Sequence, residues 1–196
     1  MKMECSWPGN NQLMQAYHDK EWCVPNTDDQ YLFEMLTLEG AQVRLSWSIV
    51  LSRREAYQKA FHNFDISYCS TLTDKDLTNL QEQYNVIKHF SKLQSVRSNA
   101  QAVIKIQQEF ESLSLFLWRY VDFKPIINHW HSEEEIPAQT PLSNEISKDL
   151  KKRGFKFIGP VTMYAFMQAI GMVDDHGTSC PYTSNKERKM KENGFH

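Results

Sequence analysis

Hydrophobic residues recur at helical spacing along most of this chain, and no alternation typical of a β-strand extends beyond a few residues. A capping box is predicted at Thr27 to Gln30, before the apolar run YLFEMLTLEG that ends at Gly40. Ser46 is a candidate cap for one helix with the sequence WSIVLSRREAYQKAF. Val96 to Gln107 and Leu113 to Val121 predict two further helices. The pattern therefore predicts an all-α fold.

Two more helices are predicted near the C-terminus, after a polar loop from His131 to Thr140. Ser143 is expected to cap the first of them, whose apolar stripe is Leu142, Ile146 and Leu150. The second helix, VTMYAFMQAI, ends at Gly171. The pair predicts a helical hairpin over about residues 143–171, followed by a polar, lysine-rich tail over about residues 181–196.

The connection inside this hairpin reads KKRGFKFIGP, with Gly154 and Gly159 on either side of its turn. A glycine permits a positive φ and lets another molecule approach the backbone closely. Pro160 suits the first turn of the next helix, whose N-terminal amides could bind a phosphate. Four basic residues surround the connection, namely Lys151, Lys152, Arg153 and Lys156. The alternative is an ordinary helical hairpin with a solvated basic cap.

The length of 196 residues, with 41% hydrophobic residues, predicts a single domain over residues 1–196, built as two intimate helical lobes. The four cysteines form no dense disulfide framework, and the N-terminus has no apolar export segment. The longest apolar run, near Thr162 to Val173, is too short to span a bilayer. We therefore expect a cytoplasmic protein without a membrane partner.

The formal net charge of −2 argues against a general polyanion binder. Lys148 to Lys156 nevertheless holds five basic residues and one acidic residue, a local charge of +4. The remaining 17 basic and 23 acidic residues sum to −6. A nearly neutral protein with one basic cluster can bind DNA locally, so the charge pattern favours a DNA-contacting patch at the hairpin.

Two cysteines and two histidines near the two ends of the chain could bind one metal ion. Cys5 and His18 lie near the N-terminus, whereas His176 and Cys180 lie four residues apart near the C-terminus. Two Cys and two His are a ligand set of closed tetrahedral zinc sites. Their spacing differs from that of a DNA-reading zinc finger, so a shared zinc would be structural. From spacing alone, four unconnected residues are the more frequent outcome.

Aromatic residues are concentrated in the N-terminal third, together with one carboxylate in an apolar helix. Glu39 follows Leu38 at the end of LFEMLTLEG, where burial is costly without a specific partner. A flat cationic heterocycle needs aromatic faces for stacking and an anion that accepts its N–H donors. The aromatic residues concerned are Trp7, Tyr17, Trp22 and Trp47. The alternatives are a glutamate that faces water and aromatics that only fill the core.

Five ordered stretches resemble the DNA-3-methyladenine glycosylase I family of bacterial base-excision repair enzymes. They are AYHDKEW (16–22), LFEMLTLEGAQ (32–42), LSW (45–47), LKKRGFKFIGP (150–160) and YAFMQAIGMVDDH (164–176). The resemblance implies a helix-hairpin-helix glycosylase with a zinc snap, one structural zinc that joins the N- and C-terminal regions. Its ligands would be Cys5, His18, His176 and Cys180.

The resemblance also implies a role for each candidate site residue. Glu39 and Tyr17 would recognise the damaged base, Trp47 would stack on it, and Trp7 and Trp22 would line the pocket. The expected DNA-contacting residues are Arg44, Leu45, Lys152, Arg153, Gly154, Lys156 and Gly159.

The implied reaction begins when the enzyme, acting as a monomer, flips 3-methyladenine out of double-stranded alkylated DNA. It hydrolyses the N-glycosidic bond and leaves an abasic site and the free base. We identify no lysine placed as a Schiff-base nucleophile, so we expect no strand cleavage.

Two other functions are compatible with parts of the sequence. A zinc-stapled DNA-binding regulator would need polar base-reading residues, but the helix after Gly159 is too apolar. A hairpin glycosylase with a catalytic aspartate would use Asp174 or Asp175, to which we assign structural roles. Release of bases from alkylated DNA distinguishes the three.

The chain departs from the family pattern at four positions. Val43 and Arg44 stand where the family usually has alanine and glycine before LSW, and the small residue and the following leucine enter the DNA stack there. A long cation at Arg44 could occupy this space or hold a phosphate. Cys23 replaces a usual glycine, and Asp174 a usual asparagine. Cys23 is expected in the core, like Cys69.

Overall fold

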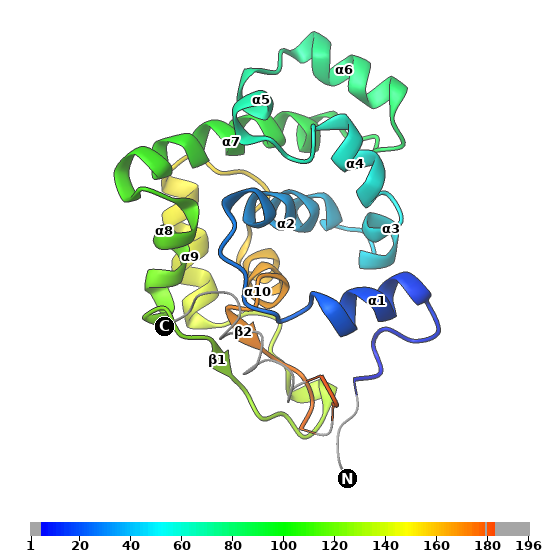
Figure 1. Cartoon of the computed structure of the whole chain (residues 1–196), viewed down its shortest axis with the longest axis vertical. Helices are drawn as coiled ribbons and strands as arrows, with labels where there is room; N and C mark the ends of the chain where they lie inside the picture. The colour runs from blue at the N-terminus through cyan, green and yellow to red at the C-terminus, as the bar shows by residue number, and fades with distance from the viewer. Residues whose placement is uncertain (1–4, 179, 183–196) are drawn as a thin grey trace.

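The computed structural model describes residues 5–178 and 180–182, and most of them are helical (Figure 1). The α-helices are α1 (Gln12–Lys20), α2 (Asp29–Gln42), α3 (Trp47–Leu51), α4 (Arg54–Ala60), α5 (Ile66–Thr71), α6 (Asp74–Gln83), α7 (Phe90–Phe110), α8 (Leu113–Trp118), α9 (Pro141–Lys152) and α10 (Pro160–Ala169). Two short 3₁₀-helices are η1 (Arg119–Val121) and η2 (Glu133–Glu135). The helical fold class is thus confirmed, although β1 (Ile126–Ile127) and β2 (Val173–Asp174) form a short parallel pair.

Several predicted helix boundaries differ from the observed ones. Asp28 caps α2, because its carboxylate accepts the Tyr31 amide at 2.7 Å, so the capping box at Thr27 was wrong. Ser46 precedes α3 but its side chain makes no capping bond. The prediction of a single helix after Ser46 is also wrong. The helix α3 ends at Leu51, and the Arg53 amide then donates to the Val50 carbonyl in a tighter turn that interrupts the helix. The helix α4 then begins separately.

The start of α9 was predicted three residues too late. Thr140, and not Ser143, is its N-cap, and the Thr140 hydroxyl accepts the Ser143 amide at 3.1 Å. The Ser143 hydroxyl oxygen in turn accepts the Thr140 amide at 2.9 Å, which completes a capping box. Pro141 occupies the first turn, where its missing N–H is not needed. Of the predicted polar tail, only residues 181 and 182 lie within the described residues.

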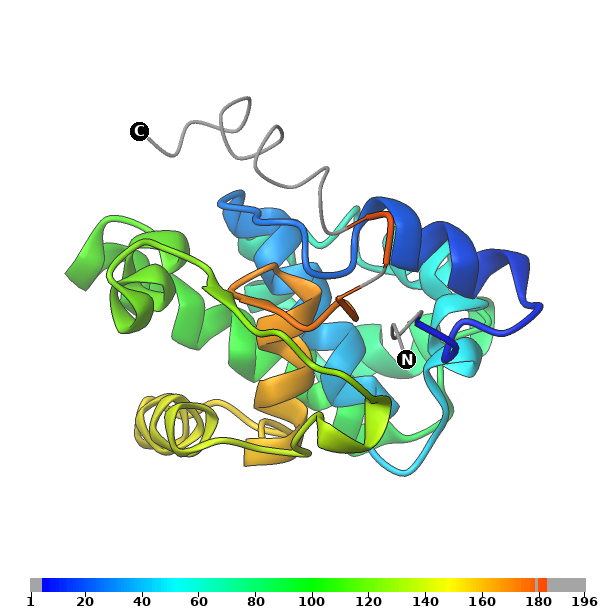
Figure 2. The same ribbon diagram turned by 90° about the horizontal axis from the view of Figure 1, so that it is seen from below.

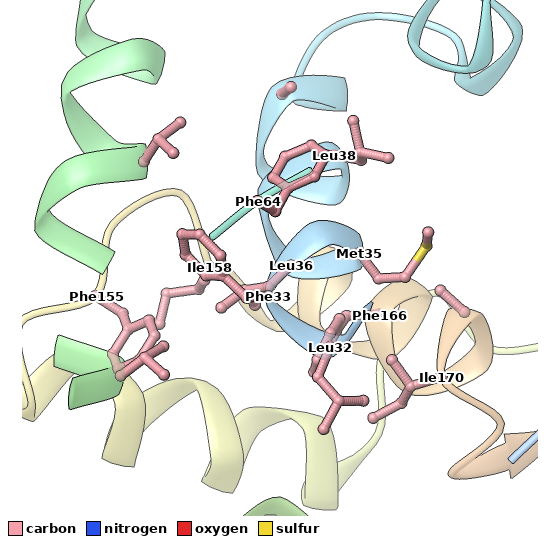
Figure 3. Packing of buried hydrophobic residues seen from close by; sticks show 14 of the residues in the cluster. Leu32, Phe33, Met35, Leu36, Leu38, Phe64, Phe155, Ile158, Phe166 and Ile170 are labelled. Carbon is pink, nitrogen blue, oxygen red and sulfur yellow. The ribbon is translucent and has the colours of Figure 1, made fainter. Parts of the chain in front are cut away.

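The helix α2 lies at the centre of the molecule and packs against α3, α7, α8 and α10. Figure 3 shows side chains of α2 close to the loop that joins α9 and α10 and to α10 itself. The labelled residues of α2 are Leu32, Phe33, Met35, Leu36 and Leu38. Those of the loop are Phe155 and Ile158, and Phe166 lies in α10 and Ile170 directly after it. Since nearly every face of the middle of α2 is covered, its polar residues Glu34, Thr37 and Glu39 are buried as well.

Backbone contacts join the N-terminal region to the end of α10. The Cys23 amide donates to the Gln168 carbonyl at 2.7 Å, and the Asn26 amide donates to the Ile170 carbonyl at 3.1 Å. Gly171 has φ +71°, and a Cβ there would lie 2.2 Å from the backbone of the segment before Asn26. Only glycine fits this approach. Figure 2 shows that the segment after β2 reaches α1, where the Tyr182 hydroxyl donates to Asp19, so the two ends of the described chain meet.

Within residues 5–178 and 180–182, the structure contains no helix of the length and hydrophobicity that crossing a membrane requires.

Candidate active site

A cavity of about 430 Å³ lies between α1, α2, the start of α3, α10 and the segment that includes η2. All five residues predicted to form a base pocket line it, namely Trp7, Tyr17, Trp22, Glu39 and Trp47. The structure therefore brings together side chains that lie up to forty positions apart in the sequence. A mainly apolar cavity with few polar groups is the usual form of a small-molecule site.

Glu39 is a buried carboxylate in the wall of this cavity, with 5% of its surface exposed. Its Oε2 atom has no hydrogen-bond partner among the described residues. Burial raises the pKa of Glu39 to about 8. Glu34 on the same helix differs, because Arg54 Nε donates to its carboxylate at 2.8 Å. A buried carboxylate without a partner in a cavity wall is a candidate functional group. On α2 this description fits Glu39 and not Glu34.

Aromatic rings line the same cavity as Glu39 and pack against one another. The Tyr17 and Trp47 ring centroids are 5.2 Å apart, and those of Trp7 and Trp22 are 5.1 Å apart. Burial and the nearby Glu39 raise the pKa of Tyr17 well above its usual value, so Tyr17 stays a neutral phenol. The indole N–H groups of Trp7 and Trp47 are buried and find no acceptor within the described part of the chain. The cavity can therefore offer aromatic faces, N–H donors and one carboxylate to a ligand.

Some residues of the cavity were not predicted. The predicted polar loop contributes Glu133, which accepts bonds from the backbone and hydroxyl of Ser6, the latter at 2.9 Å, and from the Trp7 amide at 3.2 Å. Tyr164 and Gln168 of α10 also line the cavity. Gln168 is a single polar residue in the apolar run YAFMQAI, and this could have indicated that α10 faces the cavity. No local signal indicated that Glu133 would hold the N-terminal segment.

Asp175 lies behind the cavity wall and is fully buried. Its Oδ1 atom accepts bonds from Asn128 and Trp130, and its Oδ2 atom accepts bonds from Tyr164 and Gln168, all at 2.7 Å. Four donors thus surround this carboxylate, whereas Glu39 Oε2 has none among the described residues. This arrangement holds Tyr164 and Gln168 in the wall and is that of a structural carboxylate.

Three of the four predicted zinc ligands come together in the structure. One ligand atom each from Cys5, His18 and Cys180 lies within 4.8 Å of the others. His18 Nε2 and Cys180 Sγ are 3.6 Å apart. Zinc bonds of roughly 2.3 Å to sulfur and 2.0 Å to nitrogen place two tetrahedral ligands about 3.5 Å apart, so this pair fits zinc. The fourth predicted ligand, His176, is adjacent, with its ring centroid 4.8 Å from that of His18.

Two carboxylates, those of Asp19 and Asp174, hold His18 and His176, and neither was predicted to do so. His18 Nδ1 lies 2.7 Å from Asp19 Oδ1, and His176 Nδ1 lies 3.1 Å from Asp174 Oδ1. A carboxylate on Nδ1 favours the tautomer whose lone pair is on Nε2, the usual arrangement for a metal-binding histidine. His176 also forms a second buried group with Cys23 and Asp174, whose ligand atoms lie within 4.8 Å of one another.

The two glycines of the α9–α10 connection have different roles. Gly154 has φ +96°, a conformation that side chains disfavour. Gly159 has φ −59°, which any residue adopts, and a Cβ there would meet nothing within 4 Å. Neither conformation nor internal packing requires glycine at position 159. Its bare backbone at the N-terminus of α10 is open to close approach by another molecule.

The basic residues of the connection also differ. Arg153 forms two bonds to the Glu109 carboxylate, at 2.6 and 3.2 Å, and one to Asp149 at 3.3 Å. Its guanidinium group also lies over the ring of Phe116, 4.8 Å from the centroid. Lys152 and Lys156 are exposed, and no ion pair found in the described residues includes them. The lysines are thus available to a DNA backbone, whereas Arg153 already has acidic partners.

The turn after α2 carries the two remaining predicted DNA contacts. Arg44 has φ +67° and is exposed, and Leu45 has 37% of its surface exposed. Gln42 before the turn and Trp47 after it both line the cavity. Arg44 and Leu45 therefore lie at the rim of the cavity.

Comparisons with known proteins agree with this site. The sequence pattern of a family described as methyladenine glycosylase matches residues 7–183. The DNA-3-methyladenine glycosylase of Haemophilus influenzae is 43% identical over 92% of this chain and 98% of that protein. DNA-3-methyladenine glycosylase 1 of Escherichia coli is 42% identical over 93% of this chain and 98% of that protein.

A solved structure leads to the same family. The 3-methyladenine DNA glycosylase I of Staphylococcus aureus, solved to explain 3-methyladenine recognition, superposes with a TM-score of 0.89. It is 36% identical, and the alignment covers 91% of this chain and 95% of that one. These matches confirm the resemblance drawn from the sequence. The chain belongs to the methyladenine glycosylase family of enzymes.

Proposed function

We propose that this enzyme hydrolyses the N-glycosidic bond of 3-methyladenine in double-stranded alkylated DNA, as a monomeric single domain, and leaves an abasic site. The observation that carries the proposal is Glu39, a buried carboxylate in an aromatic cavity, one oxygen of which has no hydrogen-bond partner in the described part of the chain. Methylation at N3 gives adenine a positive charge, so a carboxylate among aromatic rings is complementary to this base. The names of the relatives support the same substrate.

The reaction needs little acid catalysis, because the cationic base is already a good leaving group. Glu39 as a carboxylate would accept the exocyclic N–H of the base and stabilise its positive charge. Tyr17 would orient the base, and Trp47 would stack on it. Water would then capture an oxocarbenium-like sugar. Since the pKa of Glu39 is about 8, the cationic base would displace a proton from Glu39 as it binds near neutral pH.

A release assay tests this function directly. The enzyme is incubated with methylated duplex DNA, and the released bases are separated and identified. We expect free 3-methyladenine and intact strands with abasic sites. Release of uracil or oxidised bases instead, or strand cleavage without a second enzyme, would contradict the proposal.

The α9–α10 pair would act as the helix-hairpin-helix element that holds the DNA backbone. The first α10 amide that bonds back within the helix is that of Met163, to the Gly159 carbonyl at 2.8 Å. The amides before it point out of the helix N-terminus, where they suit a phosphate. Lys152 and Lys156 would add charge beside them. Gly154 would set the shape of the connection and Arg153 would brace it against Glu109, so both would act on DNA indirectly.

Loss of one exposed lysine should change the salt dependence of DNA binding. Lys152→Ala should weaken binding to any duplex by a similar factor and reduce the slope of log affinity against log salt by roughly one. Arg153→Ala should instead lower the melting temperature and change the slope less, because its partners are Glu109 and Asp149. Fluorescence anisotropy over a salt series checks both. A Lys152→Ala enzyme that released different bases with an unchanged slope would show that the hairpin reads bases.

The donor set near the chain ends supports one structural zinc. Cys5, His18, His176 and Cys180 would hold it, and Asp19 and Asp174 would orient the two histidines. When bound, the ion would join the N- and C-terminal regions and take no part in base release. The 3.6 Å separation of His18 Nε2 and Cys180 Sγ is the observation that fits zinc.

Metal analysis should find about one zinc per chain. Cys180→Ser should remove most of it and lower the melting temperature by roughly 5–10 °C, since one ligand of a folding-coupled site is lost. Cys69→Ser is the matched control, because Cys69 is buried but its thiol donates to the Phe61 carbonyl, away from the cluster. Unchanged zinc content in Cys180→Ser would rule out this ligand set.

A further inference from the structure

Lys92 is a buried lysine in the first turn of α7, with 7% of its surface exposed. Its ammonium group donates to the Ala41 carbonyl at 2.8 Å and to the Val43 carbonyl at 2.7 Å. No carboxylate forms an ion pair with it in the part of the chain that the structure describes. Burial and the nearby Arg44 cation lower the pKa of Lys92. A buried cation held only by carbonyls is costly, so its position calls for a specific explanation.

The two carbonyls that Lys92 binds flank the end of α2. Val43 is the residue that ends the helix, and the Leu45 amide bonds back to the Gln42 carbonyl at 2.6 Å. Between Val43 and Leu45, Arg44 has φ +67°, a left-handed conformation that is strained for a residue with a side chain. Such a conformation persists only when neighbouring contacts determine it. The two bonds from Lys92 are contacts of this kind.

The turn lies where DNA must pass if it delivers a base to the cavity. Gln42 and Trp47 line the cavity on either side of it, and the side chains of Arg44 and Leu45 are exposed. A change of backbone shape at Val43 to Leu45 would move both exposed side chains relative to the cavity rim. Glu39 lies earlier in α2, and Trp47 begins α3, which packs against α1 and α2. Helix packing therefore holds both pocket residues independently of this turn.

We propose that Lys92 is a positioning residue that holds the left-handed turn at Arg44 so that Arg44 and Leu45 meet DNA beside the flipped nucleotide. The proposal rests on the proposed function for the identity of the partner. Lys92 lies on α7, fifty positions after the end of α2. Its contribution is to the binding of DNA and not to the affinity for the free base.

Two substitutions test the role of the ammonium group. Lys92→Met keeps the length of the chain without its charge, and we expect binding and excision with methylated duplex to fall roughly ten- to a hundredfold through misplacement of the turn. Affinity for free 3-methyladenine should stay within about twofold, because the pocket is retained. Lys92→Arg keeps donors for the two carbonyls and should restore part of the loss. Lys105→Met, at an exposed lysine on the same helix, should change neither quantity.

A double-mutant cycle with Arg44→Gly tests whether Lys92 acts through the turn at Arg44. Glycine adopts a positive φ without strain, so Lys92→Met should cost several-fold less in the Arg44→Gly background than alone. Additive effects would overturn the proposal, as would an equal loss of free-base affinity in Lys92→Met. An enzyme that binds duplex but releases no 3-methyladenine would refute the proposed function, and the duplex-binding cycle would still decide the role of Lys92.

Discussion

Replacement of Glu39 by glutamine should lower both the affinity for free 3-methyladenine and the rate of its excision by roughly ten- to a hundredfold. Glutamine keeps the size of the side chain and one carbonyl acceptor but removes the negative charge. That charge would strengthen the hydrogen bond from an N–H of the free, neutral base, and it would also pair with the positive charge that the base carries in DNA. Some activity should survive, because that base leaves readily without assistance. Titration calorimetry with the free base and single-turnover excision measure the two effects.

Although Glu39→Gln should lower affinity and excision, it should raise the stability of the folded enzyme at high pH. Burial raises the pKa of folded Glu39 from 4.5 to about 8, so the folded state binds a proton more tightly than the unfolded state. An acid with a raised folded pKa favours folding below the unfolded value and loses this contribution as pH rises toward 8. Glutamine does not ionise, so Glu39→Gln does not lose stability as the pH rises. The variant should therefore be more stable than the parent enzyme at pH 8, by a few kcal/mol at most. Urea unfolding at pH 5 and pH 8 compares the two proteins. A variant that is less stable at pH 8 would show that Glu39 is stabilised by a partner in the free enzyme.

Replacement of Asp175 by asparagine should mainly affect stability, with a loss of about 3–5 kcal/mol. The carboxylate accepts four donors, two on each oxygen. An amide NH₂ in place of one oxygen would face two donors and leave them unpaired. Denaturant unfolding measures the loss, and excision is compared on protein confirmed to be folded.

The comparison of these two variants decides which carboxylate serves the reaction. We expect folded Asp175→Asn to retain more of the excision rate than Glu39→Gln. A well-folded but inactive Asp175→Asn beside a fully active Glu39→Gln would move this enzyme to the aspartate-dependent glycosylases. The structure favours the first outcome, because Asp175 is enclosed by donors while Glu39 lines the cavity.

Several features of the candidate site followed from local sequence alone. Helical periodicity and turn chemistry depend on neighbouring residues, so the hairpin helices, Gly154 with its positive φ and Pro160 in the first turn of α10 were predicted. Four aromatic residues, Trp7, Tyr17, Trp22 and Trp47, were also predicted near Glu39, and all four line the cavity. Helix starts were less accurate, because Asp28 and Thr140 competed with equally suitable residues nearby.

Tertiary structure decided which charged groups are paired, and no local pattern contains that information. Glu34 and Glu39 lie on one buried helix, but among the described residues only Glu34 meets a cation, Arg54, twenty positions along the chain. Arg153 stands in a basic cluster, yet it pairs with Glu109, forty-four positions away. The sequence by itself determined the helical fold class and the aromatic residues near Glu39, whereas the ligand set that includes Cys5, His18 and Cys180 was predicted from the family resemblance. The partners of Glu34, Arg153 and Lys92 depended on the packing of distant segments, because burial leaves a charged group only the neighbours that the fold brings to it.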